Sequence, residues 1–192
     1  MIGAMGCPRK FSRLPSRDRC YEILHENQVP PHIIAHCEKV AQVAVFLADH
    51  LCEVGEEVDR ALVEAGGLLH DLTKHVSLKT GENHALSAAR LLERLGYPEV
   101  ARVVAQHIFC PPGPPRSPIR EEELVYYADK RVKHTTIVDL KERFEDLKAR
   151  YGRTVSSLIR LDRLYELTRL MERRIFKKLP FGPEKIKELE NG

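Results

Sequence analysis

The sequence predicts an all-α protein, and three observations support this prediction. Apolar residues recur at helical spacing along most of the 192 residues. Prolines, glycines and N-cap residues divide the pattern into segments of helical length. No segment shows the alternation of apolar and polar residues that is typical of a half-buried strand. We therefore expect a compact orthogonal helical bundle with a C-terminal amphipathic helix.

The first two predicted helices are bounded by clear signals. The first runs from Ser16, a good N-cap residue, to about Asn27. Pro30 and Pro31 interrupt the pattern, and Pro31 suits the first turn of the next helix. That second helix ends at Gly55, and its apolar residues at i, i+3, i+4, i+7, i+8 and i+11 predict one buried face. The residues of this face are Val40, Val43, Ala44, Leu47, Ala48 and Leu51.

The third predicted helix starts near Val58 and contains two adjacent glycines. Because glycine costs about 1 kcal/mol in a helix interior, Gly66 and Gly67 indicate close packing against a neighbouring helix. We expect a polar loop over residues 73–82 and a further helix over residues 83–96.

Prolines and glutamates mark the boundaries of the later elements. Pro98 opens a helix that ends before the segment PPGPPRSP, residues 111–118, which can be neither helix nor central strand. Three glutamates from Glu121 suit the first turn of the next helix, because negative charge is favourable at a helix N-terminus. Two more helices are expected, near residues 139–151 and 154–179.

The pattern divides the chain into a flexible basic arm (residues 1–15), a helical core (16–152) and a C-terminal helical appendage (153–192). The arm lacks the apolar run of a secretory signal, and no stretch approaches the roughly 20 apolar residues that span a membrane. The five cysteines, an odd number without a CxxC pair, are typical of reduced thiols. We therefore expect a cytoplasmic protein without a membrane partner.

Composition and charge exclude several classes. Hydrophobic residues make up 43% and charged residues 31%, which excludes a disordered or collagen-like chain. The formal net charge of +3 does not require a nucleic-acid partner, because phosphorylated metabolites fit the sign equally well. The C-terminal basic residues could bind RNA or a membrane surface, but a solvated basic face on a packed helix is the simpler interpretation. They are Arg169, Arg173, Arg174, Lys177 and Lys178.

Six polar side chains fall on faces that the pattern predicts to be buried. They are His36, His70, Asp71, His84, His107 and Asp129. A buried carboxylate must be paired, protonated or given a cation, and no lysine or arginine lies on those faces. A single inward histidine is usually a hydrogen-bonded core residue, but a shared metal site explains all six more simply. Imidazole with carboxylate suits Fe, Mn, Zn, Co or Ni better than Ca or Mg alone.

At these residues the chain resembles the HD superfamily of metal-dependent phosphohydrolases. The matching motifs are HCEKVAQVA with His36, GGLLHDLTK with His70 and Asp71, and YYADKRV with Asp129. The resemblance covers residue 16 to about residue 150 and implies the HD-domain fold.

Two further segments, NHALSAARLLERLG and VARVVAQH, are similar to those that carry two extra histidines in the HDIG-type subset with a binuclear centre. Carried over by position, the ligands of one metal are His36, His70, Asp71 and Asp129. A second metal would share Asp71 and be held by His84 and His107. Ala85 stands where HDIG-type proteins often have glycine, and the extension of the cyclic di-GMP enzymes is missing, which counts against that substrate.

The resemblance and the ligand chemistry imply an enzyme that uses a metal-activated water to hydrolyse a phosphoester or phosphoanhydride bond, with a nucleotide as the expected substrate. One or two divalent transition metals would be bound, with Fe or Mn favoured. Asp71 and Lys74 are the expected catalytic residues, and Lys74 and Lys130 are expected to bind substrate phosphate. For each lysine, an ordinary surface charge is the alternative.

Several alternatives stay open at this point. The chain could be a nucleotide-sensing or partner-binding HD module that binds metal and ligand without turnover, or a nucleic-acid-binding protein with a structural metal. The loop at residues 111–118 could shape substrate access or act as a rigid connector. A homodimer could form through the amphipathic C-terminal helix.

Overall fold

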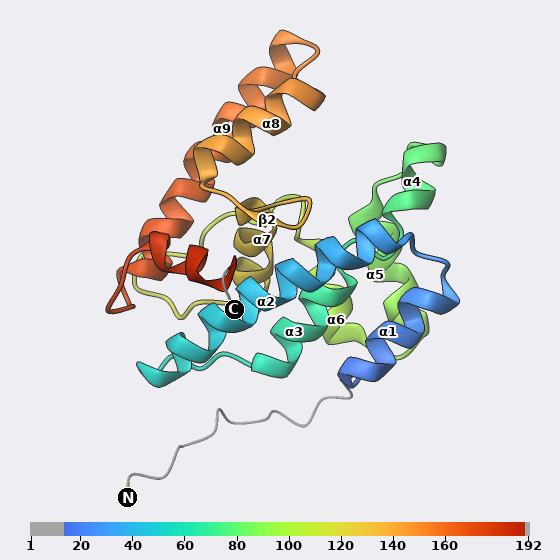
Figure 1. Ribbon diagram of the computed structural model, residues 1–192, viewed down its shortest axis with the longest axis horizontal. Coiled ribbons are helices and arrows are strands. Elements are labelled where there is room, and N and C mark those ends of the chain that lie inside the picture. The colour runs from blue at the N-terminus through green and yellow to red at the C-terminus, as the bar shows by residue number, and fades with distance from the viewer. Residues whose placement is uncertain (1–13, 191–192) are drawn as a thin grey trace, which may run out of the picture.

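The computed structural model describes residues 14–190, so the predicted arm over residues 1–15 lies almost wholly outside the described part. Within residues 14–190 the regular secondary structure is helical apart from one two-stranded ribbon, which confirms the all-α prediction (Figure 1). In chain order the elements are α1 (Arg17–Glu26), α2 (Pro31–Glu53), α3 (Arg60–Leu69), α4 (Lys74–Thr80), α5 (His84–Arg94), α6 (Pro98–Ala105), α7 (Glu121–Arg131), β1 (Val132–Lys133), β2 (Thr136–Ile137), α8 (Leu140–Tyr151), α9 (Val155–Phe176) and the 3-10 helix η1 (Pro183–Glu190).

Side-chain caps fix where several helices begin. The N-cap oxygens of Ser16, Asp59, Asn83, Asp139 and Thr154 each accept a hydrogen bond from a backbone N–H in the first turn. Such caps satisfy amide groups that have no partner inside the helix, and each is worth about 1 kcal/mol. The predicted starts of α1, α5, α8 and α9 are therefore confirmed to within a residue.

The core is built around α2, which crosses the centre of the molecule against α3 and α7 (Figure 1). The two glycines of α3 allow close approach, as predicted. A Cβ atom on Gly67 would lie 2.7 Å from the Cα of Ala41 on α2, and one on Gly66 would lie 2.7 Å from Cγ1 of Val103 on α6. The backbone of α3 is thus held tightly at the point where it leads into His70 and Asp71.

Four elements differ from the sequence prediction. Residues 74–80 form α4 where a loop was expected, because this seven-residue helix has only Ser77 buried and shows no apolar stripe. The strands β1 and β2 have two residues each, which is too short to produce an alternating pattern. The helix η1 was not predicted; its Ile186 is buried against the core.

Helices α8 and α9 lie side by side as a hairpin that projects from the core (Figure 1), and an ion pair between Lys148 and Asp162 joins them. The base of α9 is tied to α7, where Arg174 pairs with Glu123 at 2.5 Å. Arg174 is buried, so the prediction of a solvated basic face was wrong at this residue, whereas Arg169 and Arg173 are exposed. The division of the chain at residue 152 stays a prediction.

The proline-rich segment 111–118 is hydrogen-bonded to Arg174 and Glu123. Arg174 donates hydrogen bonds to the carbonyl oxygens of Pro114 and Ser117, and the Gly113 N–H donates to Glu123 at 2.8 Å. These contacts favour the interpretation of the segment as a rigid connector between α6 and α7.

The cysteines agree only partly with the prediction of reduced thiols. Cys20, Cys37 and Cys110 are buried free thiols, whereas Cys52 is disulfide-bonded, which departs from it. Cys7 lies outside the described residues. Among residues 14–190, no helix combines the length and apolar character needed to cross a membrane.

Candidate metal centre

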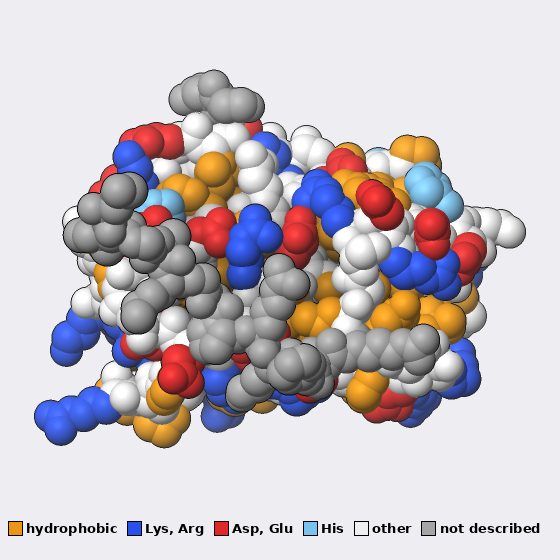
Figure 2. Space-filling view, turned by 90° about the horizontal axis from the view of Figure 1, so that it is seen from below, with side chains coloured by type: hydrophobic (Ala, Val, Ile, Leu, Met, Phe, Trp, Pro, Cys, Tyr) orange, Lys and Arg blue, Asp and Glu red, His pale blue; other side chains and the backbone are white. Residues whose placement is uncertain are grey.

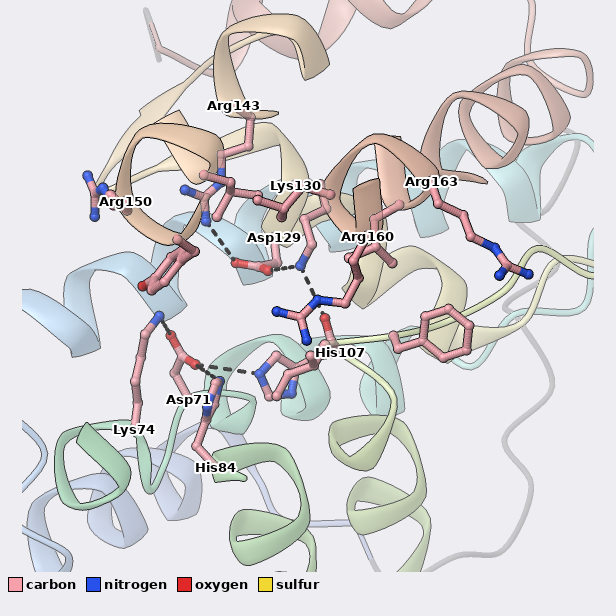
Figure 3. A pocket seen from close by; sticks show the side chains of 16 residues that line it. Asp71, Lys74, His84, His107, Asp129, Lys130, Arg143, Arg150, Arg160 and Arg163 are labelled. Carbon is pink, nitrogen blue, oxygen red and sulfur yellow. Dashed lines mark hydrogen bonds and ion pairs between the residues drawn. The ribbon is translucent and has the colours of Figure 1, made fainter. Parts of the chain in front are cut away.

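A cavity of about 690 Å³ lies between the helical core and the α8–α9 hairpin. Asp71, His84, His107 and Asp129 line it on the core side (Figure 3). Its cationic lining comes from both sides and consists of Lys74, Lys130, Arg143, Arg150, Arg160 and Arg163. By contrast, acidic and basic side chains are interspersed over the face of the molecule that Figure 2 shows.

The fold brings all six predicted ligands together from separate segments. His36 lies on α2, His84 is the first residue of α5 and Asp129 lies on α7. His70 and Asp71 follow directly after α3, and His107 lies two residues beyond α6. The ring centroids of His36 and His70 are 5.3 Å apart, those of His70 and His107 are 5.0 Å apart, and those of His84 and His107 are 4.9 Å apart.

Asp71 stands between two pairs of histidines, and each of its oxygens faces one pair. Its Oδ2 is 3.5 Å from Nε2 of His70 and 3.8 Å from Nε2 of His36. Its Oδ1 is 3.3 Å from Nε2 of His84 and 3.6 Å from Nε2 of His107. Ligand atoms bound at about 2.0–2.2 Å to a common ion lie at comparable separations, so each pair with its oxygen has the spacing of a metal site.

Asp129 adds a second carboxylate to the first of these groups. Its Oδ1 is 3.1 Å from Nε2 of His36 and 3.8 Å from Nε2 of His70. This group therefore offers two imidazoles and two carboxylates, whereas the group of His84 and His107 offers two imidazoles and shares Asp71.

Backbone carbonyls orient three of the four imidazoles. Nδ1 of His36 lies 2.7 Å from the carbonyl oxygen of His134, Nδ1 of His70 lies 2.8 Å from that of Gly67, and Nδ1 of His107 lies 2.7 Å from that of Val104. A carbonyl oxygen only accepts hydrogen bonds, so each Nδ1 must carry the proton. The lone pair on each Nε2 then faces the centre, as a metal ligand requires.

Buried polar atoms at the centre fit a bound cation. Nε2 of His70, Nε2 of His107 and Oδ1 of Asp71 have no hydrogen-bond partner among the described residues. Burial lowers the pKa of His70 to about 3, which keeps its imidazole neutral. Burial opposes ionisation of Asp71, yet the positive charge of the adjacent Lys74 helps to hold its pKa well below the usual range. Neutral imidazoles and ionised carboxylates are the forms that bind transition metals.

The two predicted phosphate-binding lysines differ in their surroundings. Nζ of Lys74 lies 2.6 Å from Oδ2 of Asp71, and its side chain is 30% exposed toward the cavity. Lys130 is buried, pairs with Asp129, donates to the carbonyl oxygen of His107 at 3.2 Å, and lies over the Tyr126 ring. Lys74 is thus the more accessible of the two.

Sequence analysis missed the other wall of the cavity. Arg143 and Arg150 of α8 and Arg160 and Arg163 of α9 line it. The exposed rings of Phe109, which follows α6, and of Tyr151 also line the cavity. Arginine on an exposed helix face is common, and these residues lie outside the motifs. The available signal was the spacing of 160, 161, 163 and 164, which places two arginines and two leucines on one helix face.

Comparison with protein families decides the assignment. Residues 33–133, more than half of the chain, match the HD domain model. The chain belongs to the HD-domain family. The HD-domain match includes all six clustered residues. It ends before α8 begins, so the arginines of the α8–α9 hairpin lie outside the match.

Curated relatives differ in how much of their length this chain spans. An uncharacterized protein of Methanocaldococcus jannaschii is 29% identical over 149 residues, which covers 71% of this chain and 87% of that protein. The tRNA (cytidine(56)-2'-O)-methyltransferase of Picrophilus torridus is 30% identical, over 67% of this chain and 40% of that protein. The dihydroneopterin 2',3'-cyclic phosphate phosphodiesterase of M. jannaschii is 33% identical, over 51% of this chain and 45% of that protein. No solved structure matches the chain significantly.

Proposed function

We propose that this HD-domain protein is a metal-dependent phosphohydrolase that hydrolyses a phosphoester or phosphoanhydride bond of a nucleotide. The observation that carries the proposal is the position of Asp71, whose two oxygens each face one pair of histidines at the floor of a cationic cavity. Similarity to a cyclic phosphate phosphodiesterase supports a phosphorylated substrate. Family membership and the buried histidine and aspartate groups support a divalent metal.

The residues divide into two groups of ligands. His36, His70, Asp71 and Asp129 would hold one ion, and Asp71 with His84 and His107 would hold the other. Fe or Mn suits this mixture of nitrogen and oxygen ligands, while Zn, Co or Ni is compatible with it. When bound, such ions lower the pKa of a water molecule and polarise a phosphoryl oxygen.

Hydrolysis forms a bond between phosphorus and the oxygen of water and breaks the bond between phosphorus and the leaving oxygen. Lys74 is the group best placed to assist the leaving oxygen, because its ammonium lies 2.6 Å from Asp71 and is partly open to the cavity. Proximity to Asp71 and Asp129 outweighs burial and raises the pKa of Lys74, so it stays protonated and can donate a hydrogen bond or a proton to that oxygen.

Lys130 and Arg143 surround Asp129 from the opposite side. Lys130 pairs with its Oδ2, and Nη2 of Arg143 lies 3.8 Å from its Oδ1. Although burial opposes ionisation, the charges of Lys130 and Arg143 help to hold the pKa of Asp129 well below its usual range. Their role in this proposal is to keep Asp129 ionised and oriented, and Lys130 could also contact a phosphate at the cavity wall.

The experiment that tests the proposal starts with protein purified without oxygen and loaded with Mn²⁺ or Fe²⁺. It is incubated with a mixed nucleotide pool, and mass spectrometry identifies the species that disappear and their products. We expect one nucleotide class to be hydrolysed, and we expect Asp71→Ala to lose both the bound metal and the turnover. Asp18→Ala, at an exposed residue of α1, is the control and should retain both.

Either of two results would contradict the proposal. One is full turnover by Asp71→Ala, and the other is tight nucleotide binding by the metal-loaded protein without any product. The second result would favour the alternative function, in which the HD module senses a nucleotide. The α8–α9 hairpin gives this alternative a structural basis, because its arginines could bind a nucleotide whether or not hydrolysis follows.

A further inference from the structure

The two helices of the hairpin supply two arginines each to the cavity, but these arginines differ in their partners. On α8, Asp146 bridges both residues, with its Oδ2 3.2 Å from Nη1 of Arg143 and its Oδ1 2.9 Å from Nε of Arg150. Arg150 also lies 2.9 Å from Nε2 of His134, whose carbonyl oxygen orients His36. The arginines of α8 are therefore held in place by the protein itself.

The two cavity arginines of α9 are held by no such contact within the part of the chain that the structure describes. Within residues 14–190, the guanidinium groups of Arg160 and Arg163 make no hydrogen bond or ion pair with another side chain or backbone group. Asp162, the acidic residue between them, pairs with Lys148 on α8 instead. Figure 3 shows both arginines extending from α9, with Arg160 reaching into the cavity. Among the described residues, two positive charges without an acidic partner thus line the cavity, Arg160 on the side of the metal-ligand residues and Arg163 turned away from them (Figure 3).

The same cavity exposes two aromatic rings. Phe109 is 56% exposed and Tyr151 is 52% exposed, and both line the cavity. Exposed rings beside a cationic groove are the surface on which a nucleobase stacks. The cavity volume of about 690 Å³ lies in the range typical of sites for one small ligand, which favours a free nucleotide over a length of nucleic acid.

The positions of the charges indicate how many phosphates the ligand carries. In the proposed reaction, the phosphoryl group that is cleaved would lie next to the metal-ligand residues and Lys74. Arg160 and Arg163 come from a different helix on the opposite wall, where a phosphate next to that group would meet them. We propose that Arg160 and Arg163 bind a second phosphate of the substrate, so that the site selects nucleotides with at least two consecutive phosphates over nucleoside monophosphates. This inference rests on the proposed function, because it assigns the substrate of the same site.

The test measures binding by titration calorimetry to the full chain loaded with Mn²⁺. The probes are adenosine 5'-(α,β-methylene)diphosphate, which resists hydrolysis at the bridged bond, and adenosine 5'-monophosphate. We expect the wild type to bind the diphosphate at least about tenfold more tightly, since charge-assisted hydrogen bonds to phosphate are strong. The double variant Arg160→Ala with Arg163→Ala should lose about this factor, while its affinity for the monophosphate changes less than about threefold.

The matched control is Arg173→Ala, which removes an exposed arginine of the same helix outside the cavity and should leave both affinities unchanged. Equal wild-type affinity for the two probes would overturn the inference, as would an equal loss in the control variant. Tighter binding of a 5'-phosphorylated oligoribonucleotide than of the diphosphate would overturn it in favour of RNA.

The binding measurement separates failure of this inference from failure of the proposed function. Selective, arginine-dependent binding by a protein that shows no turnover would support the inference and contradict the hydrolase. Hydrolysis of monophosphates that is insensitive to the double variant would support the hydrolase and contradict the inference.

Discussion

The two walls of the cavity are built in opposite ways. On the core wall, backbone carbonyls orient the rings of His70 and His107 through Nδ1, while Nε2 of each ring and Oδ1 of Asp71 are buried without a hydrogen-bond partner among the described residues. On the hairpin wall, Arg160 and Arg163 are exposed and have no hydrogen-bond or ion-pair partner within residues 14–190. A buried, preoriented group acts at a fixed position, whereas an exposed flexible cation can adapt to a ligand. The comparison suggests that the core wall performs the chemistry and the hairpin wall selects the substrate.

Removal of a ligand from the core wall should have the largest effect. We expect His36→Ala to lower kcat about 1000-fold or more and to reduce the metal content, because loss of a metal ligand exceeds the roughly 10–100-fold effect of an outer partner. Metal analysis and turnover under Mn²⁺ check this. His32→Ala, at an exposed residue one turn earlier on α2, is the control and should retain both properties. Equal losses in the two variants would show that the position of His36 has no special role.

A substitution at Lys74, on the same wall, tests the chemical step separately from metal binding. We expect Lys74→Met to lower kcat about 100-fold, the low end of the range for a group that assists proton transfer, without reducing the metal content. The control is Lys79→Met, an exposed lysine of the same short helix. An unchanged kcat in Lys74→Met would show that Lys74 has no catalytic role and is an ordinary surface charge.

The glycines of α3 test whether the core wall depends on close packing. In Gly67→Ala, the new Cβ would meet the backbone of Ala41 at 2.7 Å, so we expect a loss of about 2 kcal/mol in the free energy of unfolding. Metal affinity should fall too, since the carbonyl of Gly67 orients His70. Gly66→Ala meets only side-chain atoms of Val103 and Val125 and should cost less, because these can move. Urea titration of both variants checks this order.

Loss of the ion pair between Glu123 and Arg174, which joins α9 to α7, should have a smaller, pH-dependent effect on the free energy of unfolding. Burial opposes ionisation of Glu123, but hydrogen bonds from Gly113, Arg120 and Arg174 outweigh it and lower its pKa. A lowered pKa in the folded state contributes stability that is fully present above the unfolded value of about 4.3 and is lost progressively as the pH falls from there through the folded pKa. We expect Glu123→Gln to cost about 1 kcal/mol at pH 7 and less at pH 4. Urea unfolding at both values measures the difference, and an equal cost at each would contradict it.

The residues of the core wall could be predicted from the sequence, because they are polar residues on helix faces that are otherwise apolar. The inward positions of His36 and Asp129 were visible from their spacing to Val40 and Val125. The hairpin wall gave no such violation, because arginine on an exposed helix face is ordinary. Only the packing of α8 and α9 brings Arg160 to the cavity, and that tertiary arrangement is not encoded in local spacing.

The short elements escaped prediction for a related reason. Helix α4 has almost no buried face, so the spacing of its apolar residues does not distinguish it from a loop. Its first residue is nevertheless Lys74, which lies beside Asp71. The turn between β1 and β2 places the carbonyl of His134 beside His36, with His134 itself at φ +57°. Both contacts depend on backbone positions that only the assembled fold defines.

The measurement that tests the central claim most directly is anomalous diffraction from crystals of the Mn²⁺-loaded protein. The account predicts two peaks that both contact Asp71, one between His36, His70 and Asp129 and the other between His84 and His107. Peaks elsewhere on the molecule, or an occupied centre in which Asp71 contacts no ion, would contradict it.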